Sequence, residues 1–376
     1  MPGTDTNGVT FITDKSEKKQ FLDFPYSHYS DDQYWIPPLK LEQKKLLDTK
    51  KNPFFNNAEI ALFLAFHNDK PAGRIAAIID HRYNEYHNEK TGFFGFFEVI
   101  NNRETANLLF RVGEDWLKDK GMNRVLGPAN PSMMDPVGIL IEGFDKYPAI
   151  MMPYNKKYYK DLLSSAGYKK EVDLYSYYVS QETVNRERVN RAEAIVKKRV
   201  PGLNIRPINL KNLKSEVAAI RIIFNEAWKD NWGYIPLTEE EFDHFAADLK
   251  TIVDPDFTHM ADVDGKTVAF SIALPDYNQV FKKMDGTLFP LGLLKLLWYK
   301  RKINTTRTAL MGVLPSYQGK GIDVLMHRET IENSFERDYQ GSEIGWILED
   351  NTEMIRVAEK VGGMLVKTYR VYQKKL

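Results

Sequence analysis

The stretch GVLPSYQGKGID (312–323) contains the residues whose types and spacing best suit chemistry in this chain. An apolar strand would end in its first half and a helix would begin near Ile322, so the intervening backbone N–H groups would lack helical partners. Free amides at a helix N-terminus attract anions. Gly319 and Gly321 would let the backbone approach a ligand closely, and Lys320 would add a cation. The stretch therefore predicts a phosphate-binding loop; the alternative interpretation is a plain surface turn between a strand and a helix.

Two common phosphate-binding motifs do not fit this stretch. A Walker A loop needs G-x4-G-K-[ST], but six residues separate Gly312 from Gly319, and Gly321 stands where a magnesium-binding hydroxyl is required. A dinucleotide-binding fingerprint needs a third glycine, which does not follow. A Walker A loop and a dinucleotide-binding loop are therefore weaker interpretations of this stretch.

The overall composition narrows the function further. The chain has 376 residues, 43% hydrophobic and 27% charged, which is typical of a globular protein long enough for two domains. Its 52 basic and 51 acidic residues leave a formal charge of +1, so no broad positive field would recruit nucleic acid. There is no cysteine, which excludes disulfides, thiolate catalysis and cysteine-ligated metals. The seven histidines are scattered without an HExxH pair, so we expect no metal.

Targeting and membrane signals are weak. The first residues show no basic region followed by an apolar run, so we expect a cytoplasmic location. The longest apolar stretch, TLFPLGLLKLLWY (287–299), is short and is interrupted by Pro290 and Lys295, which argues against a transmembrane segment.

Strand and helix patterns follow the same order in each half of the chain. The first half predicts two strands around an Asn68–Asp69 turn within 60–80, strands at 92–100, 123–129 and 168–180, and helices at 104–121 and 156–167. The second half predicts strands at 203–208, 257–275 around an Asp264–Gly265 turn, 307–314, 342–348 and 364–375, and helices at 212–229, 238–250, 320–338 and 350–361.

A shift of 196 positions relates the two halves. It carries Lys70 onto Lys266, Asn155 onto Asn351 and Gly167 onto Gly363. Single-residue echoes also arise by chance, but these fall at matching places in matching element orders. We therefore infer an internal duplication, with its boundary in the charged stretch 181–200.

The second half resembles the GNAT superfamily of acyl-coenzyme A dependent N-acyltransferases, and the whole chain resembles a tandem pair. The run from Gln318 to Asp323 is similar to the family's [QR]-x-x-G-x-[GA] loop, whose amides hold the pyrophosphate of coenzyme A. The run EDNTEMIRVAEKVGG is similar to the family's later unit, in which an asparagine (Asn351) opens a helix and a glycine (Gly362) ends it. The first half follows by repeat and by element order only.

This resemblance implies an α/β fold of two tandem GNAT-like domains, each a mixed, mostly antiparallel sheet flanked by helices. We expect a degenerate domain without a pyrophosphate loop at 1–180, a linker at 181–200, and an acyl-CoA-binding domain at 201–376. After the strand at 92–100 the first half reads NNRETANLL, with no glycine, so we expect no coenzyme A there.

The activity that the resemblance implies is acyl transfer from acetyl-CoA or another acyl-CoA to an amine of a small molecule or peptide. The backbone amide near Val313 would polarise the thioester carbonyl, the loop amides would anchor the pyrophosphate, and Asn351 would face the pantetheine arm. The predicted coenzyme-binding residues are Met311, Gly312, Val313, Gln318, Gly319, Lys320, Gly321, Ile322, Asp323 and Asn351.

Four further side chains are candidates for the acceptor side of the site. Tyr234, with two nearby tryptophans, would line a pocket or simply pack in an aromatic loop. Asp276 and Tyr277 follow a predicted strand and would orient or deprotonate an amine, or form a solvated turn. Glu349 would act as a base, or stand before a helix as carboxylates commonly do.

Three positions depart from the family pattern. Asp323 stands where the family prefers a small residue and places a carboxylate near the expected phosphates. Ala358 replaces the tyrosine often credited with protonating the leaving thiolate, and Gly363 replaces an aromatic residue. A catalytically degenerate binding or scaffold protein is therefore the main alternative, and a transferase that uses aminoacyl-tRNA is disfavoured by the neutral charge.

The insertion at 282–307 carries an apolar run that ends in a basic cluster. We consider a lid over an acyl chain, a contact with a membrane surface through 287–303, and burial against the first domain, of which we favour the last. The acyl group, the acceptor and the oligomeric state stay open.

Overall fold

The internal contacts of the chain divide it into two units, and neither unit is a single stretch of sequence. The structure is a computed structural model that describes residues 8–376, apart from the side chains of residues 248 and 249. The first unit comprises the residues up to Asp173 together with Phe281–Leu294 and Thr368–Leu376, and the second comprises Leu174–Val280 and Lys295–Lys367. Most of the expected linker 181–200 is helix α6 (Arg186–Arg199) of the second unit. The domain limits at residues 180 and 201 stay a prediction.

The first unit is a sheet in the order β1-β2-β3-β4-β5 followed by the end of β13, with β6 paired to β13. Neighbouring strands are antiparallel except β4 and β5. Its strands are β1 (Val9–Phe11), β2 (Ala58–His67), β3 (Lys70–Asp80), β4 (Thr91–Val99), β5 (Arg124–Gly127) and β6 (Ile139–Glu142). Its helices are α1 (Lys15–His28), α2 (Lys40–Leu46), α3 (His81–His87), α4 (Arg103–Asp119) and α5 (Tyr159–Ser165).

The second unit repeats this plan as a sheet in the order β7-β12-β11-β10-β9-β8, in which only β11 and β12 are parallel. Its strands are the part of β7 (Lys169–Ser180) that begins at Leu174, together with β8 (Leu203–Pro207), β9 (Thr258–Val263), β10 (Lys266–Pro275), β11 (Thr305–Val313) and β12 (Gly341–Leu348). Its other helices are α7 (Leu213–Trp228), α8 (Glu239–Leu249), α9 (Asn278–Phe281), α11 (Ile322–Glu336) and α12 (Thr352–Lys360); β13 (Met364–Lys375) closes the chain, and α10 (Leu291–Tyr299) spans the limit between units.

The predicted fold class and element order are confirmed. Both predicted hairpin turns are present, and Asn68, Asp69, Asp264 and Gly265 all have positive φ, as tight turns between antiparallel strands require. The two halves also match in position, because Lys70 is the first residue of β3 and Lys266 is the first residue of β10.

Each unit contains a strand from the opposite half of the sequence. The last seven residues of β7, which lies in the first half of the chain, pair with β12 from Leu174↔Leu348 to Ser180↔Gly341. The end of β13, from the second half, pairs with β5 between Tyr372↔Gly127 and Lys375↔Arg124. Chain order therefore does not coincide with spatial order.

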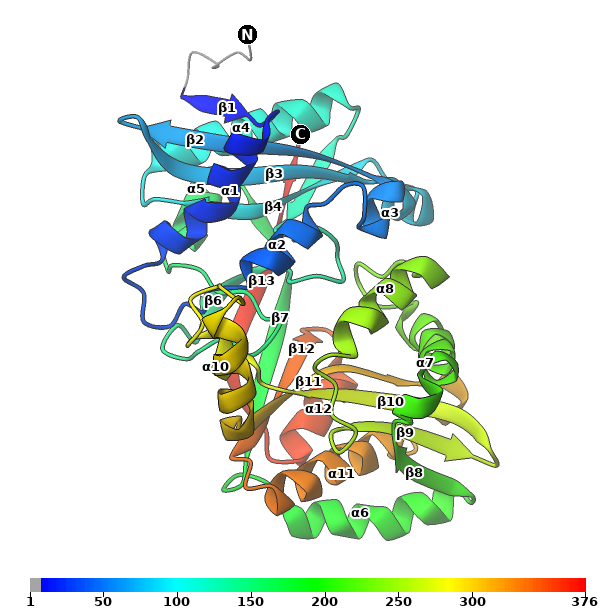
Figure 1. Cartoon of the computed structure of the whole chain (residues 1–376). Coiled ribbons are helices and arrows are strands. Elements are labelled where there is room, and N and C mark those ends of the chain that lie inside the picture. Colours follow the sequence, from blue (N-terminus) through cyan, green and yellow to red (C-terminus); the bar gives the residue numbers. More distant parts are fainter. Residues whose placement is uncertain (1–7) are drawn as a thin grey trace. The chain divides into compact units, whose positions relative to one another are not determined.

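Helices cover both faces of the second unit's sheet (Figure 1). On one face Ala269 and Ile322, with Val313 half-buried beside them, pack against Val196 of helix α6. Residues that alternate with them along the strands face α7, since a Cβ at Gly312 would lie 3.3 Å from Cγ2 of Ile223. The two faces are thus set by strand alternation.

The insertion before α10 packs on the first unit, but the helix itself does not bury its apolar side chains. The Lys40 N–H donates to the Gly286 carbonyl at 2.9 Å, which ties the insertion to α2. By contrast, Leu291, Leu294 and Trp298 of α10 are each more than 60% exposed. The favoured interpretation, burial of this run, is therefore wrong for α10.

Candidate functional site

The two parallel strands of the second unit diverge after a short paired segment. β11 and β12 are in register from Thr305↔Gly341 to Thr308↔Ile344, and no later pair joins them in the described chain. β11 nevertheless continues to Val313. Its register with β10 skips Ala309, which is a β-bulge, and a bulge bends and twists the strand that contains it. The outer half of β11 therefore presents backbone groups that no neighbouring strand takes up on the β12 side.

Hydrogen-bond alternation decides which groups these are. The Leu314 N–H donates to the Val268 carbonyl of the neighbouring strand at 2.9 Å. Because antiparallel pairs alternate between bonded and non-bonded, the backbone groups of Val313 and Met311 point away from β10, and those of Gly312 point toward it. The Met311 carbonyl accepts a hydrogen bond from Nε1 of Trp228 at 2.9 Å. The Val313 amide is thus turned into the divergence, as an oxyanion donor would need to be.

The loop that follows β11 places open amides at a helix N-terminus. Gly319 and Gly321 have φ of +70° and +90°, which glycine adopts readily. Gly321 caps α11 without a side-chain hydrogen bond, and within residues 8–376 the N–H groups of 319–322 donate to no other residue. Lys320 lies beside them, its Nζ 4.7 Å from the centre of the Tyr317 ring. The arrangement is that of an anion site formed by the backbone.

The two glycines of this loop differ in their surroundings. A Cβ added at Gly319 would meet no atom within 4 Å, whereas one at Gly321 would lie 2.8 Å from Cγ2 of Val196 on α6. Gly321 therefore also serves the packing of α6 on α11, but Gly319 has no such constraint.

Asp323 lies half-buried in the first turn of α11. Burial raises the pKa of its carboxyl group above the ordinary value, although hydrogen bonds from the backbone N–H groups of Val324 and of Asp323 itself oppose this rise. The carboxylate thus takes up amides at the same helix end that would hold a phosphate.

Asn351 and Ala358 mark the two ends of α12. Asn351 caps this helix, its Oδ1 accepting the Met354 N–H at 3.1 Å. Ala358 is fully buried in a cluster with Tyr177 and Ile347. Ala358 therefore contributes packing, with no group that could donate a proton.

The structure separates the acceptor-side candidates. Tyr234 is buried and its hydroxyl donates to Oδ1 of Asn225 at 3.0 Å, which fits a packed aromatic loop. Asp276 accepts the Asn278 N–H at 3.2 Å just beyond β10, and burial raises the pKa of the neighbouring Tyr277. Glu349 is half-buried directly after β12. Their catalytic roles stay predictions.

A buried charged cluster near the paired segment of β11 and β12 was not predicted from the sequence. Glu343 on β12 accepts hydrogen bonds from Nζ of Lys367 and Oγ of Ser176, each at 2.6 Å, and Lys367 is only 3% exposed. Arg307 of β11, in register with Glu343, donates to the Gly345 carbonyl at 2.8 Å. The sequence does contain a signal for this cluster, because Arg307, Glu343 and Lys367 are charged residues within predicted strands.

Tyr178 connects this cluster to a predicted residue. Tyr178 is opposite Glu343 on β7, and its pKa is raised by burial first and then by the negative charges of Glu343 and Asp276. Asp276 therefore lies near the cluster.

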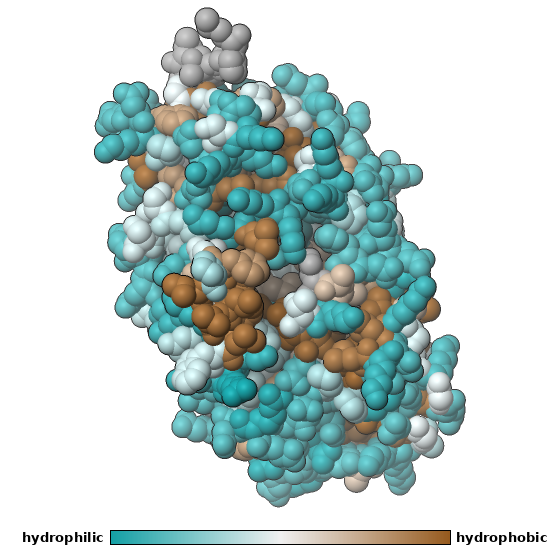
Figure 2. Space-filling view, in the orientation of Figure 1, coloured by the Kyte–Doolittle hydropathy of each residue, from teal (hydrophilic) through white to brown (hydrophobic). Residues whose placement is uncertain are grey.

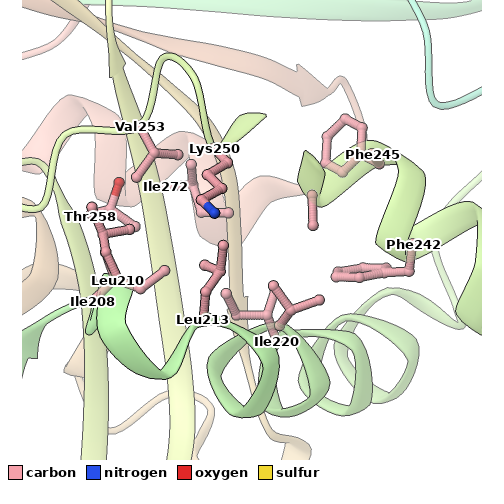
Figure 3. Close-up of a pocket in the computed structure, with 12 residues that line it drawn as sticks. Ile208, Leu210, Leu213, Ile220, Phe242, Phe245, Lys250, Val253, Thr258 and Ile272 are labelled. Atoms are coloured by element: carbon pink, nitrogen blue, oxygen red, sulfur yellow. The ribbon is translucent and has the colours of Figure 1, made fainter. Parts of the chain in front are cut away.

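An apolar cavity that is partly open to solvent lies on the α7 face of the sheet. Figure 3 shows side chains of α7, α8 and the sheet arranged around it, with Lys250 among them. Ile272, one of its walls, is in register with Leu310 on the diverging part of β11. Its lining residues are Ile208, Leu210, Leu213, Val217, Ile220, Phe242, Phe245, Ala246, Lys250, Val253, Thr258 and Ile272.

The corresponding place in the first unit is filled by its own chain. β4 and β5 are parallel only from Thr91↔Arg124 to Phe93↔Leu126. Beyond that point the Ala129 N–H donates to the Phe94 carbonyl at 2.9 Å, and Oδ1 of Asn130 accepts the Phe96 N–H at 2.5 Å. The helix that follows is capped by Asn102 in place of a glycine loop. The first unit thus has no open strand edge at this point.

Within the described residues no three His, Asp or Glu side chains come together as a metal site would require. The helices of residues 8–376 also include none long and apolar enough to cross a bilayer.

Known proteins are similar to this chain in sequence or in fold. The chain is 35% identical over 375 residues to protein YghO of Escherichia coli (strain K12), covering 98% of this chain and 95% of that protein. It is 34% identical to the bacterial ceramide synthase of Caulobacter vibrioides (strain NA1000 / CB15N), covering 100% of both. A tandem GNAT protein from the clavulanic acid biosynthesis pathway has the same fold, with a TM-score of 0.57, 98% of each chain covered and 9% identity.

No family model matches the chain. The two sequence relatives nevertheless extend over nearly its whole length. The chain therefore has the fold of a tandem GNAT protein, and it belongs to the family that includes YghO and the bacterial ceramide synthase.

Proposed function

We propose that this protein is an acyl-CoA dependent N-acyltransferase whose second unit binds the acyl-CoA. The observation that carries the proposal is the combination of the β11–β12 divergence with the open amides of residues 319–322. The divergence offers the Val313 amide to a thioester carbonyl, and the loop offers amides and Lys320 to a pyrophosphate. The filled divergence in the first unit agrees with a single coenzyme site.

The chemistry follows from these positions. The acceptor amine attacks the thioester carbonyl carbon, a C–N bond forms, the C–S bond breaks, and the sulfur leaves as a thiolate. The Val313 N–H would hold the oxygen that becomes negative on the way. The amine arrives as an ammonium and loses two protons in all, one before it attacks and one as the amide forms. We propose that Asp276 takes the first, since the nearby Glu343 is already neutralised by Lys367, and that the second passes to solvent. Ala358 offers no proton to the thiolate, so solvent would supply it.

We further propose that one of the two substrates carries a long alkyl chain. A ceramide is the amide of a fatty acid and a long-chain amino alcohol, and one relative is named for making it. The apolar cavity beside β10 would bury such a chain, and burial of each methylene contributes about 0.8 kcal/mol. The amine of a sphingoid base is therefore the acceptor class to test first.

The experiment compares two glycine variants under calorimetric titration with coenzyme A and under an acyl-CoA turnover assay. Gly319→Ala places a methyl group in the proposed loop, and Gly265→Ala places one in the β9–β10 turn. Both glycines have positive φ, +70° and +79°, and open surroundings, so each variant loses a similar amount of stability, about 1 kcal/mol. We expect Gly319→Ala to weaken coenzyme binding at least tenfold and Gly265→Ala to leave it unchanged.

The same assay separates the enzyme from the scaffold alternative. An enzyme should release free coenzyme A thiol from a long-chain acyl-CoA only when a long-chain amine is present. Wild-type protein that binds no coenzyme A at millimolar concentration would contradict the proposal, and binding without turnover would support a degenerate binding protein.

A further inference from the structure

Helix α10 has an arrangement that is unusual for the surface of a globular protein. Its exposed face is entirely apolar and its packed face includes the only charged residue of the helix, Lys295. Gly292, on the packed face, is buried so tightly that an added Cβ would lie 2.0 Å from the Thr287 carbonyl oxygen. The exposed side chains, with their exposed fractions, are Leu291 67%, Leu293 39%, Leu294 63%, Leu297 51% and Trp298 68%.

The helix is held in this orientation by the loop in front of it. Gly286 accepts a hydrogen bond from the Lys40 N–H, and a Cβ there would lie 2.5 Å from Cε1 of Tyr26. Phe289, just before the helix, is 64% exposed and extends the apolar surface. Figure 2 shows the resulting brown patch over α10. Exposing an apolar helix face to water costs free energy, and here a tightly packed turn holds the face in that exposed position. An exposed apolar patch of this kind indicates an interaction surface.

Cations follow this apolar face directly. Lys300, Arg301 and Lys302 form the turn at the end of α10, and all three are exposed. Nζ of Lys302 lies 5.9 Å from the centre of the Trp298 ring and 5.5 Å from that of Tyr299. In proteins that bind an anionic bilayer, apolar side chains enter the acyl region, tryptophan rings lie at the level of the headgroups, and clustered cations contact the lipid phosphates.

We propose that α10 and residues 300–302 dock this protein on an anionic membrane surface. The helix lies in the interface with its exposed leucines and Trp298 among the upper acyl chains, while the cations face lipid phosphates. Nine residues are too few to span a bilayer, so the contact is peripheral and reversible. The proposal does not depend on the acyl-transfer site and stands or falls separately from it.

The test is sedimentation of the full chain with vesicles of phosphatidylcholine alone or with 30% phosphatidylglycerol, at low and at physiological salt. We expect binding to the anionic vesicles, weakening as salt rises. Leu294→Glu combined with Leu297→Glu should reduce binding at least tenfold, because the apolar face can then no longer enter the interface. Ile195→Glu is the matched control, since Ile195 is a 52% exposed aliphatic residue on another helix.

The basic turn has its own matched pair of variants. Replacing Lys300, Arg301 and Lys302 with glutamine should weaken binding to anionic vesicles by roughly fivefold for each charge removed. The matched control replaces Lys197, Lys198 and Arg199 at the end of α6 with glutamine. It removes the same charge from an exposed site, and it should weaken binding to anionic vesicles far less than the replacement of residues 300–302.

Three outcomes would overturn the proposal. The first is no binding of the wild type to anionic vesicles at low salt, and the second is equal loss in the α10 variants and their controls. The third is a wild-type dimer in analytical ultracentrifugation that Leu297→Glu converts to a monomer, without any vesicle binding, because the patch would then be a contact between copies of this chain.

Discussion

Asp323 occupies the residue position at which coenzyme binding and folding would compete. Its carboxylate accepts backbone N–H groups at the start of α11, the end of the helix that would otherwise be offered to a phosphate. An acidic residue here gains from the helix dipole but loses from burial, and the raised pKa shows that burial is the larger effect.

Replacing Asp323 with asparagine should therefore raise the free energy of unfolding at neutral pH. A folded-state pKa above the ordinary 3.8 means that the folded protein holds the proton more tightly than the unfolded chain. The free energy of unfolding of the wild type should thus fall as the pH rises from about 3.8 through the raised pKa, and the variant lacks this fall. Urea unfolding at a series of pH values should show a stability difference at pH 7 that narrows in acid.

Glu104→Gln is the matched control, because Glu104 is also the second residue of its helix, α4, but is exposed. A difference between Asp323→Asn and wild type that grows in acid would contradict the assignment. So would an equal stabilisation by Glu104→Gln.

At the scale of elements, α7 and α8 decide what the α7 face of the second unit can bind. They surround the apolar cavity next to β10, and Ala246 of α8 is one of its smallest lining residues. The neighbouring Ala247 is exposed and does not line the cavity. The two alanines therefore form a natural pair for testing whether the cavity holds an alkyl chain.

Ala246→Phe should fill the cavity and reduce turnover of long-chain substrates by roughly tenfold or more, since several methylenes at about 0.8 kcal/mol each lose their burial. Turnover of short-chain substrates should change little. Ala247→Phe places the same ring on the exposed surface and should change the turnover of neither long-chain nor short-chain substrates. The measurement is kcat/KM across a series of acyl-CoA and amine chain lengths; a uniform loss at all lengths would show that the cavity does not select for chain length.

At the scale of the whole molecule, the exchanged strands make each unit depend on both halves of the chain. β7 supplies the partner of β12, and residues 186–199 supply α6, although both precede residue 201. In the first unit, Arg370 of β13 donates two hydrogen bonds to Asp173, at 2.7 and 2.9 Å, and Lys374 contacts Glu114 at 2.8 Å. The boundary between the two halves of the sequence therefore does not coincide with the boundary between the two structural units.

A fragment of residues 201–367 should consequently fail to fold cooperatively, whereas one of residues 174–367 should fold. The shorter fragment lacks six buried apolar side chains, Leu174, Tyr177, Val179, Val189, Val196 and Val200. Their burial contributes roughly 9 kcal/mol, comparable with the total stability of a typical domain. Circular dichroism and thermal unfolding of both fragments make the comparison, and equal, cooperative unfolding of the two would contradict the strand exchange.

The sequence by itself determined the elements and the loop. Local rules apply there: alternation sets the strands, Asn-Asp and Asp-Gly pairs set the turns, and glycines set a helix start that only a residue tolerant of positive φ can make. The regions around Gly319 and the hairpin at Asp264–Gly265 were predicted for these local reasons, and the structure agrees at each of these places.

Only the tertiary structure decided which residues share a site and which strand completes which sheet. Glu343, Lys367 and Ser176 are far apart in the chain, and their contact depends on pairing between β7 and β12 that no local pattern encodes. The exposure of the α10 leucines could not be predicted either, because a run of apolar residues has the same sequence pattern whether the structure buries it or exposes it. Long-range pairing and burial are properties of the packed chain, and a single sequence records them only indirectly.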